Sequence, residues 1–252
     1  MNYKISAVSY ANTYPFLYAI QNSKLIKDIS LSLDYPALCA EKLLTNQVDI
    51  GLVPIAILPK LKEYHIISDY CIGAVGKVKS VLLLSDVPLN EIKTIWLDYQ
   101  SKTSINLTKV LAANYWKINP EWQNTTAGFE TQISGTTAGV VIGDRTFNLE
   151  KTYNYVYDLS EEWQKFTGLP FVFACWVANK KIDVEFINQF NKALSDKMFN
   201  TDEVLNYFNI DEDKKAFLTN YLKNDISYHL DEAKRNAIEK FLNLFSKQLP
   251  TS

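Results

Sequence analysis

The sequence contains an unbroken apolar run, Phe171-Val172-Phe173-Ala174-Cys175-Trp176-Val177-Ala178, and a shorter one, Gly139-Val140-Val141-Ile142. Runs of this kind are typical of central strands whose two faces are both covered, as in the parallel sheets of α/β proteins. Both runs are far shorter than the ~20 residues that cross a bilayer. We therefore predict that Gly139–Ile142 and Phe171–Val177 are central parallel strands of a buried sheet.

Working outward from these runs, strand-like and helix-like patterns alternate along most of the chain. The other predicted strands are Tyr3–Ser9, Ile29–Asp34, Asp49–Val53, Ser80–Leu84 and Thr94–Leu97. The predicted helices are Pro15–Gln21, Leu38–Leu44, Ser104–Trp116, Val184–Lys197, Asp202–Phe208, Asp213–Lys223 and Asp231–Lys247. This alternation predicts an α/β fold with mostly parallel sheets and a helical C-terminal region.

The length of 252 residues is consistent with two domains or one large one, and no linker rich in Pro, Gly or Ser divides the chain. We therefore expect the chain to cross between two lobes on strands, at Val81–Asp86 and Phe173–Asn179. Lobe I would comprise residues 1–86 and 176–252, and lobe II residues 87–175. Ligands of such folds bind where strand ends and helix starts converge, here expected in an interlobe cleft.

Composition excludes several classes of protein. The chain is 47% hydrophobic and 21% charged, which is incompatible with disorder. Its 26 basic and 28 acidic residues provide no positive field for nucleic acid or an anionic membrane. The N-terminus lacks the apolar stretch of about 7–15 residues that a signal peptide requires. We expect a soluble, cytoplasmic protein with a small-molecule substrate, and the sequence predicts no particular oligomeric state.

Cofactor motifs are missing as well. The two histidines are far apart, and the three cysteines show no metal-ligand spacing. The sequence has neither GxGxxG nor a P-loop, so we expect no metal and no organic cofactor. An odd number of cysteines is consistent with a reducing compartment, in which buried thiols act as small hydrophobic groups. The aromatic residues between Trp163 and Trp176 are predicted as core and cleft wall.

Two polar turns in the first third of the chain are candidate ligand sites. In the turn from Ser9 to Pro15, Asn12 or Thr13 could either contact a ligand or cap the helix that begins near Pro15. The turn from Gly73 to Ser80 has two glycines and two lysines, which favour close approach and attraction of an anion. Locally, the second turn is better explained as a surface hairpin with solvated lysines.

Two further turns follow strands in the middle of the chain. Asp98–Ser104 places three hydroxyls and a lysine at the start of a predicted helix, more than capping needs, which favours an anion site. In Ile142-Gly143-Asp144-Arg145, an acidic residue directly follows a buried strand. Asp144 could act on a ligand, pair with Arg145 or cap a helix, and the local sequence does not separate these alternatives.

Six blocks, in order along residues 4–178, resemble the menaquinone biosynthesis family typified by chorismate dehydratase of the futalosine route. The blocks are Ser9–Pro15, Asp49–Pro54, Val78–Leu83, Leu97–Ser104, Ile142–Asp144 and Asp158–Ala174. The resemblance implies a two-lobed fold like that of type 2 periplasmic binding proteins. It also implies a hydro-lyase that converts chorismate to 3-[(1-carboxyvinyl)oxy]benzoate without a metal or organic cofactor.

The resemblance also implies roles for individual residues. Asn12 and Ser80 match the family's catalytic polar residues, and Thr103 and Ser104 match a hydroxyl pair that binds a substrate carboxylate. The other residues expected to bind substrate are Ser9, Tyr10, Lys79, Gly143 and Asp144. The sequence departs from the family pattern at Lys79 and Lys102, where arginine is expected. Lysine keeps the charge but loses the bidentate fork.

No side chain in these blocks is an obvious strong general base, so a carboxylate of the substrate itself could accept the ring proton.

Two other functions compete with the dehydratase. One is the sister enzyme of the pathway, 1,4-dihydroxy-6-naphthoate synthase, which the Ser-Tyr-Ala-Asn turn and the lack of histidine in residues 87–175 disfavour. The other is a non-catalytic solute-binding protein for a small aromatic carboxylate, which would require export.

Overall fold

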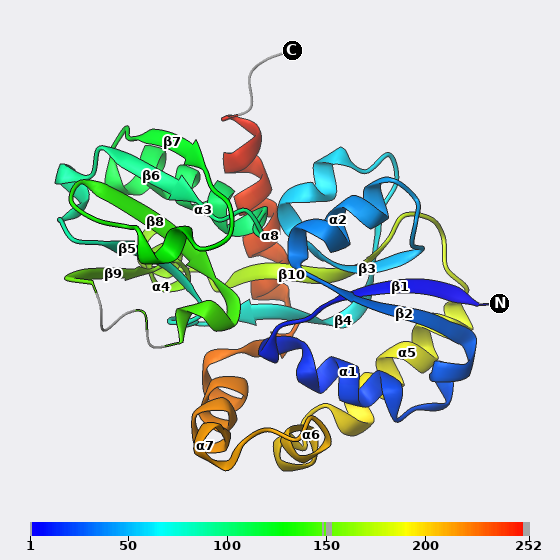
Figure 1. Cartoon of the computed structure of the whole chain (residues 1–252). Coiled ribbons are helices and arrows are strands. Elements are labelled where there is room, and N and C mark those ends of the chain that lie inside the picture. The colour runs from blue at the N-terminus through cyan, green and yellow to red at the C-terminus, as the bar shows by residue number, and fades with distance from the viewer. Residues whose placement is uncertain (1, 148, 150–152, 249–252) are drawn as a thin grey trace. The chain divides into compact units, whose positions relative to one another are not determined.

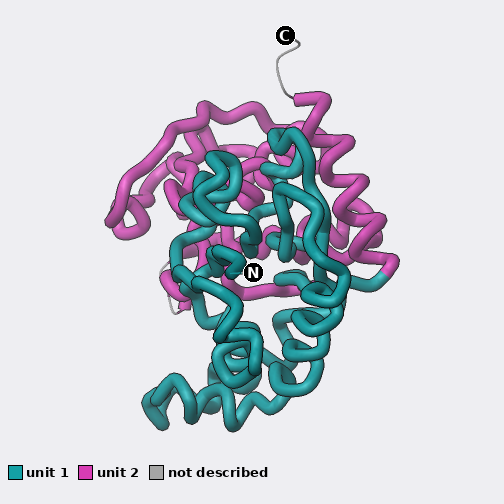
Figure 2. Tube along the Cα trace, turned by 90° about the vertical axis from the view of Figure 1, so that its right-hand side faces the viewer, with its two compact units in different colours: residues 1–73, 172–231 teal, residues 74–171, 232–252 magenta. Residues whose placement is uncertain are grey.

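The structure is a computed structural model that describes residues 2–147, 149 and 153–248. It divides into two compact units, coloured separately in Figure 2. Unit 1 comprises residues 1–73 and 172–231, and unit 2 comprises residues 74–171 and 232–252. The chain therefore passes from one unit to the other three times.

Unit 1 is built on a six-stranded sheet of order β11-β4-β10-β3-β1-β2. The strands are β1 (Tyr3–Val8), β2 (Ile29–Asp34), β3 (Ile50–Pro54), β4 (His65–Ala74), β10 (Phe171–Ala178) and β11 (Ser227–His229). β1 pairs in parallel with β2 and β3, whereas β10 is antiparallel to β3 and β11 is antiparallel to β4. The sheet is therefore mixed.

Helices cover both faces of this sheet. The helices of unit 1 are α1 (Tyr14–Gln21), α2 (Pro36–Leu44), α5 (Val184–Lys197), α6 (Thr201–Tyr207) and α7 (Glu212–Asn220), with a π-helical turn at Tyr221–Asp225. Helix α2 lies on one face against β1 and β3, and α1 and α5 pack together on the other (Figure 1). Trp176 of β10 is fully buried between Phe16 of α1 and Phe190 of α5, with ring centroids 5.7 and 5.2 Å away. Aromatic contacts thus anchor the strand on this face.

Unit 2 is built on a five-stranded sheet of order β7-β6-β8-β5-β9. Its strands are β5 (Val81–Ser85), β6 (Thr94–Leu97), β7 (Glu121–Asn124), β8 (Thr137–Ile142) and β9 (Tyr155–Asp158). Its helices are α3 (Thr103–Leu111), continued by a π-helical turn at Ala112–Trp116, α4 (Leu159–Thr167) and α8 (Glu232–Ser246). The rings of Trp163, Phe171 and Phe241 pack edge to face, which joins α4 and α8 in one aromatic core.

The mixed α/β class with two sheets is confirmed, but strand directions differ from the expected parallel ones. β10 is buried along its whole length, as its apolar run predicts, yet it is antiparallel to β3. β8 is parallel to β6 but antiparallel to β5. Burial of both faces makes a strand apolar whichever way its neighbours run, so the composition of the run carries no information on direction.

The C-terminal region is also less uniformly helical than expected. Ser227–His229, between the predicted helices Asp213–Lys223 and Asp231–Lys247, forms β11. Helix α4 (Leu159–Thr167), earlier in the chain, has no counterpart among the predicted helices. Helix α4 begins after its N-cap Asp158 and ends at its C-cap Gly168, which has φ 76°. These are residue types that commonly begin and end helices.

The units differ from the predicted lobes in three segments. Residues 172–175 belong to unit 1, because β10 pairs with β3. Residues 74–86 belong to unit 2 because β5 pairs with β8 and β9. Residues 232–252 also belong to unit 2, since α8 packs against α3. The local pattern identified β5 and α8 but gave no information on which unit each one joins.

The three cysteines, Cys39, Cys71 and Cys175, are buried and free, and burial raises the pKa of the Cys39 thiol to about 12. They therefore act as small core side chains, as predicted. Within the described part of the chain, no helix combines the length and the apolar character needed to cross a bilayer.

Candidate functional site

The turn between β1 and α1 carries Asn12 at its centre. The Asn12 side chain is buried, and its Nδ2 donates to the hydroxyl of Tyr221 at 3.4 Å. The hydroxyl of Thr13 donates to Asn12 Oδ1 at 3.2 Å. Thr13 is the N-cap residue of α1, but no side chain makes the capping hydrogen bond. The capping explanation for Asn12 and Thr13 is therefore wrong, and the amide of Asn12 is oriented by other contacts.

The backbone of this turn is also fixed from the C-terminal part of unit 1. The Tyr228 hydroxyl donates to the carbonyl oxygen of Asn12 at 2.9 Å. Burial raises the pKa of Tyr228 well above its usual value, so the hydroxyl stays protonated and remains a donor. Sequence reasoning missed Tyr221 and Tyr228 as partners of Asn12, because they lie more than 200 residues along the chain.

Ser9 and Tyr10 lie in the same turn. Ser9 is exposed, and its N–H donates to the carbonyl of Asp34 at 3.0 Å. Tyr10 is half-buried, and its carbonyl accepts from the N–H of Thr13 at 2.9 Å. The structure thus groups the predicted residues of unit 1 around one short turn after a parallel strand.

In unit 2, the turn before β5 holds Ser80 in a strained backbone. Lys79 has φ 62°, a left-handed conformation that a residue with a Cβ adopts only at a cost. Asp158 stabilises this turn, because its Oδ2 accepts from the N–H groups of Val78 and Lys79 at 2.9 and 2.7 Å. Ser80 is buried directly after the strained residue. The turn is not a hairpin, because β4 and β5 belong to different sheets, although Lys77 is exposed as that explanation expected.

The same carboxylate caps α4. Asp158 Oδ1 accepts from the N–H groups of Ser160 and Glu161 at 3.0 and 3.3 Å. Burial raises the pKa of Asp158 to about 6, although four N–H donors favour the ionised form. Its two oxygens therefore join the helix to the turn that precedes Ser80. The sequence block that begins at Asp158 belonged to the family resemblance, but nothing in it indicated this contact.

The single helical turn after β8 lies against the Ser80 turn. The Gly143 N–H donates to the Ser80 carbonyl at 2.9 Å, and the Thr146 hydroxyl donates to the Lys79 carbonyl at 3.0 Å. Gly143 has φ 68°, which glycine adopts without strain. Asp144 is half-buried in this turn. Two of the predicted turns are therefore directly hydrogen-bonded to each other.

A second buried carboxylate, that of Asp98, joins the third predicted turn to the end of β8. Asp98 Oδ2 accepts from the Ile142 N–H at 3.0 Å, and its Oδ1 accepts from the Gln100 N–H at 2.9 Å. Farther along the turn, Ser101 Oγ accepts from the Ser104 N–H at 3.0 Å. A hydroxyl that lies before the helix thus supplies the cap. Thr103 and Ser104 are both buried in the first turn of α3.

The arrangement in unit 2 is suited to an anion more than to a metal. The first turn of a helix provides N–H groups and a positive dipole end, and buried hydroxyls add neutral donors. His65 contacts Glu63, and His229 stacks on Phe199, so both lie outside the four turns. Among residues 2–147, 149 and 153–248, no three His, Cys, Asp or Glu side chains are grouped as metal ligands.

Comparison with known proteins identifies relatives of the whole chain. Residues 3–247 match the family described as menaquinone biosynthesis. Protein AF1704 from Archaeoglobus fulgidus has a similar structure, with a TM-score of 0.75, 15% identity and coverage of 98% of this chain and 97% of that one.

Two other similar structures have the periplasmic-binding-protein fold. The aliphatic sulphonate binding protein SsuA from Escherichia coli has a TM-score of 0.60 at 11% identity, over 99% of this chain and 94% of that one. The Candida albicans CA3427 product, described as having the generic periplasmic binding protein fold, has a TM-score of 0.56 at 12% identity, over 100% and 92%. At these identities the likeness establishes the fold alone, and it confirms the expected periplasmic-binding-protein-like class.

Replacing Asp158 tests the role of the four converging donors. In Asp158→Asn the amide keeps one acceptor oxygen and presents an NH2 group to two of the four N–H donors. We expect the free energy of unfolding, measured in urea at pH 7.5, to fall by about 2 kcal/mol. Asp183→Asn is the matched control, because Asp183 caps α5 through Oδ1 alone. An equal loss of stability in both variants would contradict the assigned role.

Proposed function

The chain belongs to the menaquinone biosynthesis family, and from this membership and its polar turns we propose that it is a chorismate dehydratase. In this proposal it eliminates water from chorismate to give 3-[(1-carboxyvinyl)oxy]benzoate, as a cytoplasmic hydro-lyase of the futalosine route. The family match supports a role in menaquinone biosynthesis, and the specific reaction is the part that we propose.

One observation carries the proposal: three polar turns of unit 2 are joined by hydrogen bonds. The Ser80 turn bonds to the Gly143 turn, and Asp98 bonds the strand end before Gly143 to the turn that leads into α3. These turns supply hydroxyl groups, N–H groups and a helix N-terminus. A substrate with two carboxylates and a leaving hydroxyl needs donors of this kind.

The proposed chemistry is an elimination that ends in an aromatic ring. The ring C–H and the ring C–OH bonds of chorismate break, the C–H electron pair forms the new ring double bond, and the hydroxyl leaves with a proton as water. Because aromatisation supplies the driving force, the protein has mainly to orient the substrate and to stabilise developing charge. A carboxylate of the substrate would accept the ring proton.

The roles of individual residues follow from their chemistry. Thr103 and Ser104, at the positive end of the α3 dipole, would bind one carboxylate. Ser80 would donate a hydrogen bond at the reacting ring, and its backbone is held by the Gly143 N–H. Asn12 would orient the enolpyruvyl group, with its amide fixed by Tyr221 and Thr13. Lys79, Gly143, Asp144, Ser9 and Tyr10 remain candidates for substrate contact.

The direct test is turnover of chorismate by the purified protein. We expect an aromatic product, seen by ultraviolet absorbance, whose mass is that of chorismate less one water. A parallel incubation uses the cyclic futalosine-derived substrate of 1,4-dihydroxy-6-naphthoate synthase. Conversion of that compound, but not of chorismate, would replace the dehydratase by the sister enzyme. Binding of chorismate without product would favour a solute-binding protein.

Substitution of the two proposed catalytic residues should lower turnover. Loss of one donor aimed at developing charge costs roughly 10²–10³-fold in kcat, so we expect Ser80→Ala and Asn12→Ala to lower kcat by about that factor. Ser246→Ala, which removes an exposed hydroxyl bonded to the Asn243 carbonyl, serves as the control. Near wild-type turnover of Asn12→Ala would eliminate the role assigned to Asn12.

The pH profile should depend on Asp158. Burial raises the pKa of this carboxyl to about 6, and only the ionised form can accept all four N–H bonds. Because the folded state binds this proton more tightly than the unfolded state does, protonation as the pH falls through 6 does not unfold the chain; it takes one acceptor position away from the four N–H groups and so alters the Ser80 turn. We predict that kcat/KM declines below pH 6 with a slope of one proton. In Asp158→Asn this limb should disappear, and a limb that persists unchanged would assign it to another group.

A further inference from the structure

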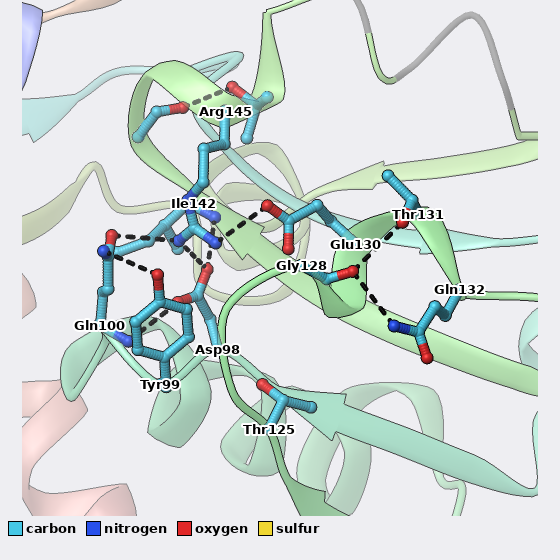
Figure 3. A network of polar contacts seen from close by, with 12 residues as sticks. Asp98, Tyr99, Gln100, Thr125, Gly128, Glu130, Thr131, Gln132, Ile142 and Arg145 are labelled. Atoms are coloured by element: carbon cyan, nitrogen blue, oxygen red, sulfur yellow. Dashed lines mark hydrogen bonds and ion pairs between the residues drawn. The ribbon is translucent and has the colours of Figure 1, made fainter.

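Arg145 is surrounded by groups from two other segments of unit 2 (Figure 3). Its Nη2 donates to Asp98 Oδ2 at 2.6 Å and to Gln100 Oε1 at 3.2 Å. Its Nη1 lies 3.6 Å from Glu130 Oε1, and its guanidinium group lies 5.3 Å from the centre of the Tyr99 ring. Arg145 thus connects the turn after β8 with the turn after β6 and with residue 130.

Most of these contacts fall on one loop, Asp98–Ser104, which leads into α3. Arg145 binds the side chains of its first and third residues, Asp98 and Gln100. The Gln100 amide in turn donates to the Tyr99 hydroxyl at 3.0 Å. The loop then continues to Ser101, whose hydroxyl caps α3 at Ser104. A single guanidinium group therefore fixes the start of the loop whose end presents Thr103 and Ser104.

In the Asp98–Arg145 pair that anchors the loop, the ionised state of Asp98 depends on the positive charge of Arg145. The Asp98 side chain is 0% exposed, whereas that of Arg145 is 23% exposed. Burial raises the pKa of Asp98, and the positive charge of Arg145 is the first influence that opposes it. Without the cation, Asp98 would be an uncompensated buried charge or would take up a proton. An unpaired buried charge destabilises the folded loop, and a protonated carboxyl accepts more weakly from the Gln100 and Ile142 N–H groups.

The geometry requires arginine in particular. Two of its nitrogen atoms face three different acceptors, which a lysine ammonium cannot reproduce with a single nitrogen. The rest of the chain uses arginine very little. Of its 26 basic residues only Arg145 and Arg235 are arginine. Position 145 is thus one of two positions in this sequence with a planar guanidinium group.

We infer that Arg145 is a positioning residue for substrate binding: through Asp98 and Gln100 it fixes the Asp98–Ser104 loop, so that Thr103 and Ser104 meet a substrate carboxylate in a defined orientation. This inference depends on the proposed function for the identity of the ligand. Arg145 itself is assigned no contact with the substrate. It acts through the loop, so its loss should weaken binding more than it slows the chemical step.

The test compares Arg145→Gln, Arg145→Lys and the control Lys165→Gln, which removes the ion pairs of exposed Lys165 with Glu161 and Glu162 in α4. We expect Arg145→Gln to raise the KM for chorismate about tenfold with kcat changed less than about threefold, in line with the loss of charged hydrogen bonds. Arg145→Lys should lie between Arg145→Gln and the wild type. The control should match the wild type.

A purely structural role predicts a different result. Partial misfolding lowers the fraction of active molecules, so kcat would fall while KM stayed constant, and that outcome would overturn the inference. A double-variant comparison adds a second criterion. Because Asp98 and Arg145 act through the same contact, adding Asp98→Asn to Arg145→Gln should change KM by less than about twofold. Independent, multiplicative effects would contradict the proposed coupling.

Hydrogen–deuterium exchange provides a readout that does not require activity. In unliganded Arg145→Gln, exchange should accelerate in peptides that cover residues 98–106 and at Ile142, whose N–H donates to Asp98, and should stay unchanged in β5 and α4. If the wild type does not convert chorismate, the proposed function fails, and exchange alone decides the inference about Arg145. Acceleration confined to residues 98–106 and Ile142 would then support it. Unchanged exchange, or acceleration throughout unit 2, would overturn it.

Discussion

Hydrogen bonds from backbone N–H groups to two buried carboxylates organise the polar turns of unit 2. Asp158 accepts from four N–H groups in two segments, and Asp98 accepts from two, with Arg145 as a third donor. Buried N–H groups at strand and helix ends require acceptors, and an ionised carboxylate offers more acceptor sites than any neutral side chain. The candidate site depends on these two residues for its shape.

In unit 1, neutral hydroxyl groups provide the hydrogen-bond partners for a buried polar turn. The β1–α1 turn, which holds Asn12, is contacted by the hydroxyls of Tyr221 and Tyr228, from a π-helical turn and a short strand far along the chain. Tyrosine combines an apolar ring, which packs in the core, with a hydroxyl that reaches a polar group. The residue proposed to orient the substrate is thereby tied to the last segments that enter unit 1.

One of the four described non-glycine residues with positive φ lies where the proposed chemistry is expected. Lys79 adopts a left-handed conformation immediately before Ser80, and Asp158 and Thr146 bind the N–H and carbonyl groups of that residue. Such a conformation persists only where the surroundings over-determine it. A left-handed backbone position normally prefers glycine. Because lysine occupies it here, the surrounding hydrogen bonds, and not local preference, set the path of the chain.

The amino-acid pattern by itself determined the α/β class, the β1, β2 and β6 strands, helix α5, and the polar turns that carry Asn12, Ser80, Thr103 and Gly143. These follow from apolar periodicity and helix-capping chemistry, which act over a few residues. Only the tertiary structure decided that β10 is antiparallel to β3, that β5 and α8 belong to unit 2, and that Arg145 binds Asp98. Strand direction, sheet membership and ion-pair partners depend on contacts between residues distant in sequence, and local pattern contains no information on those contacts.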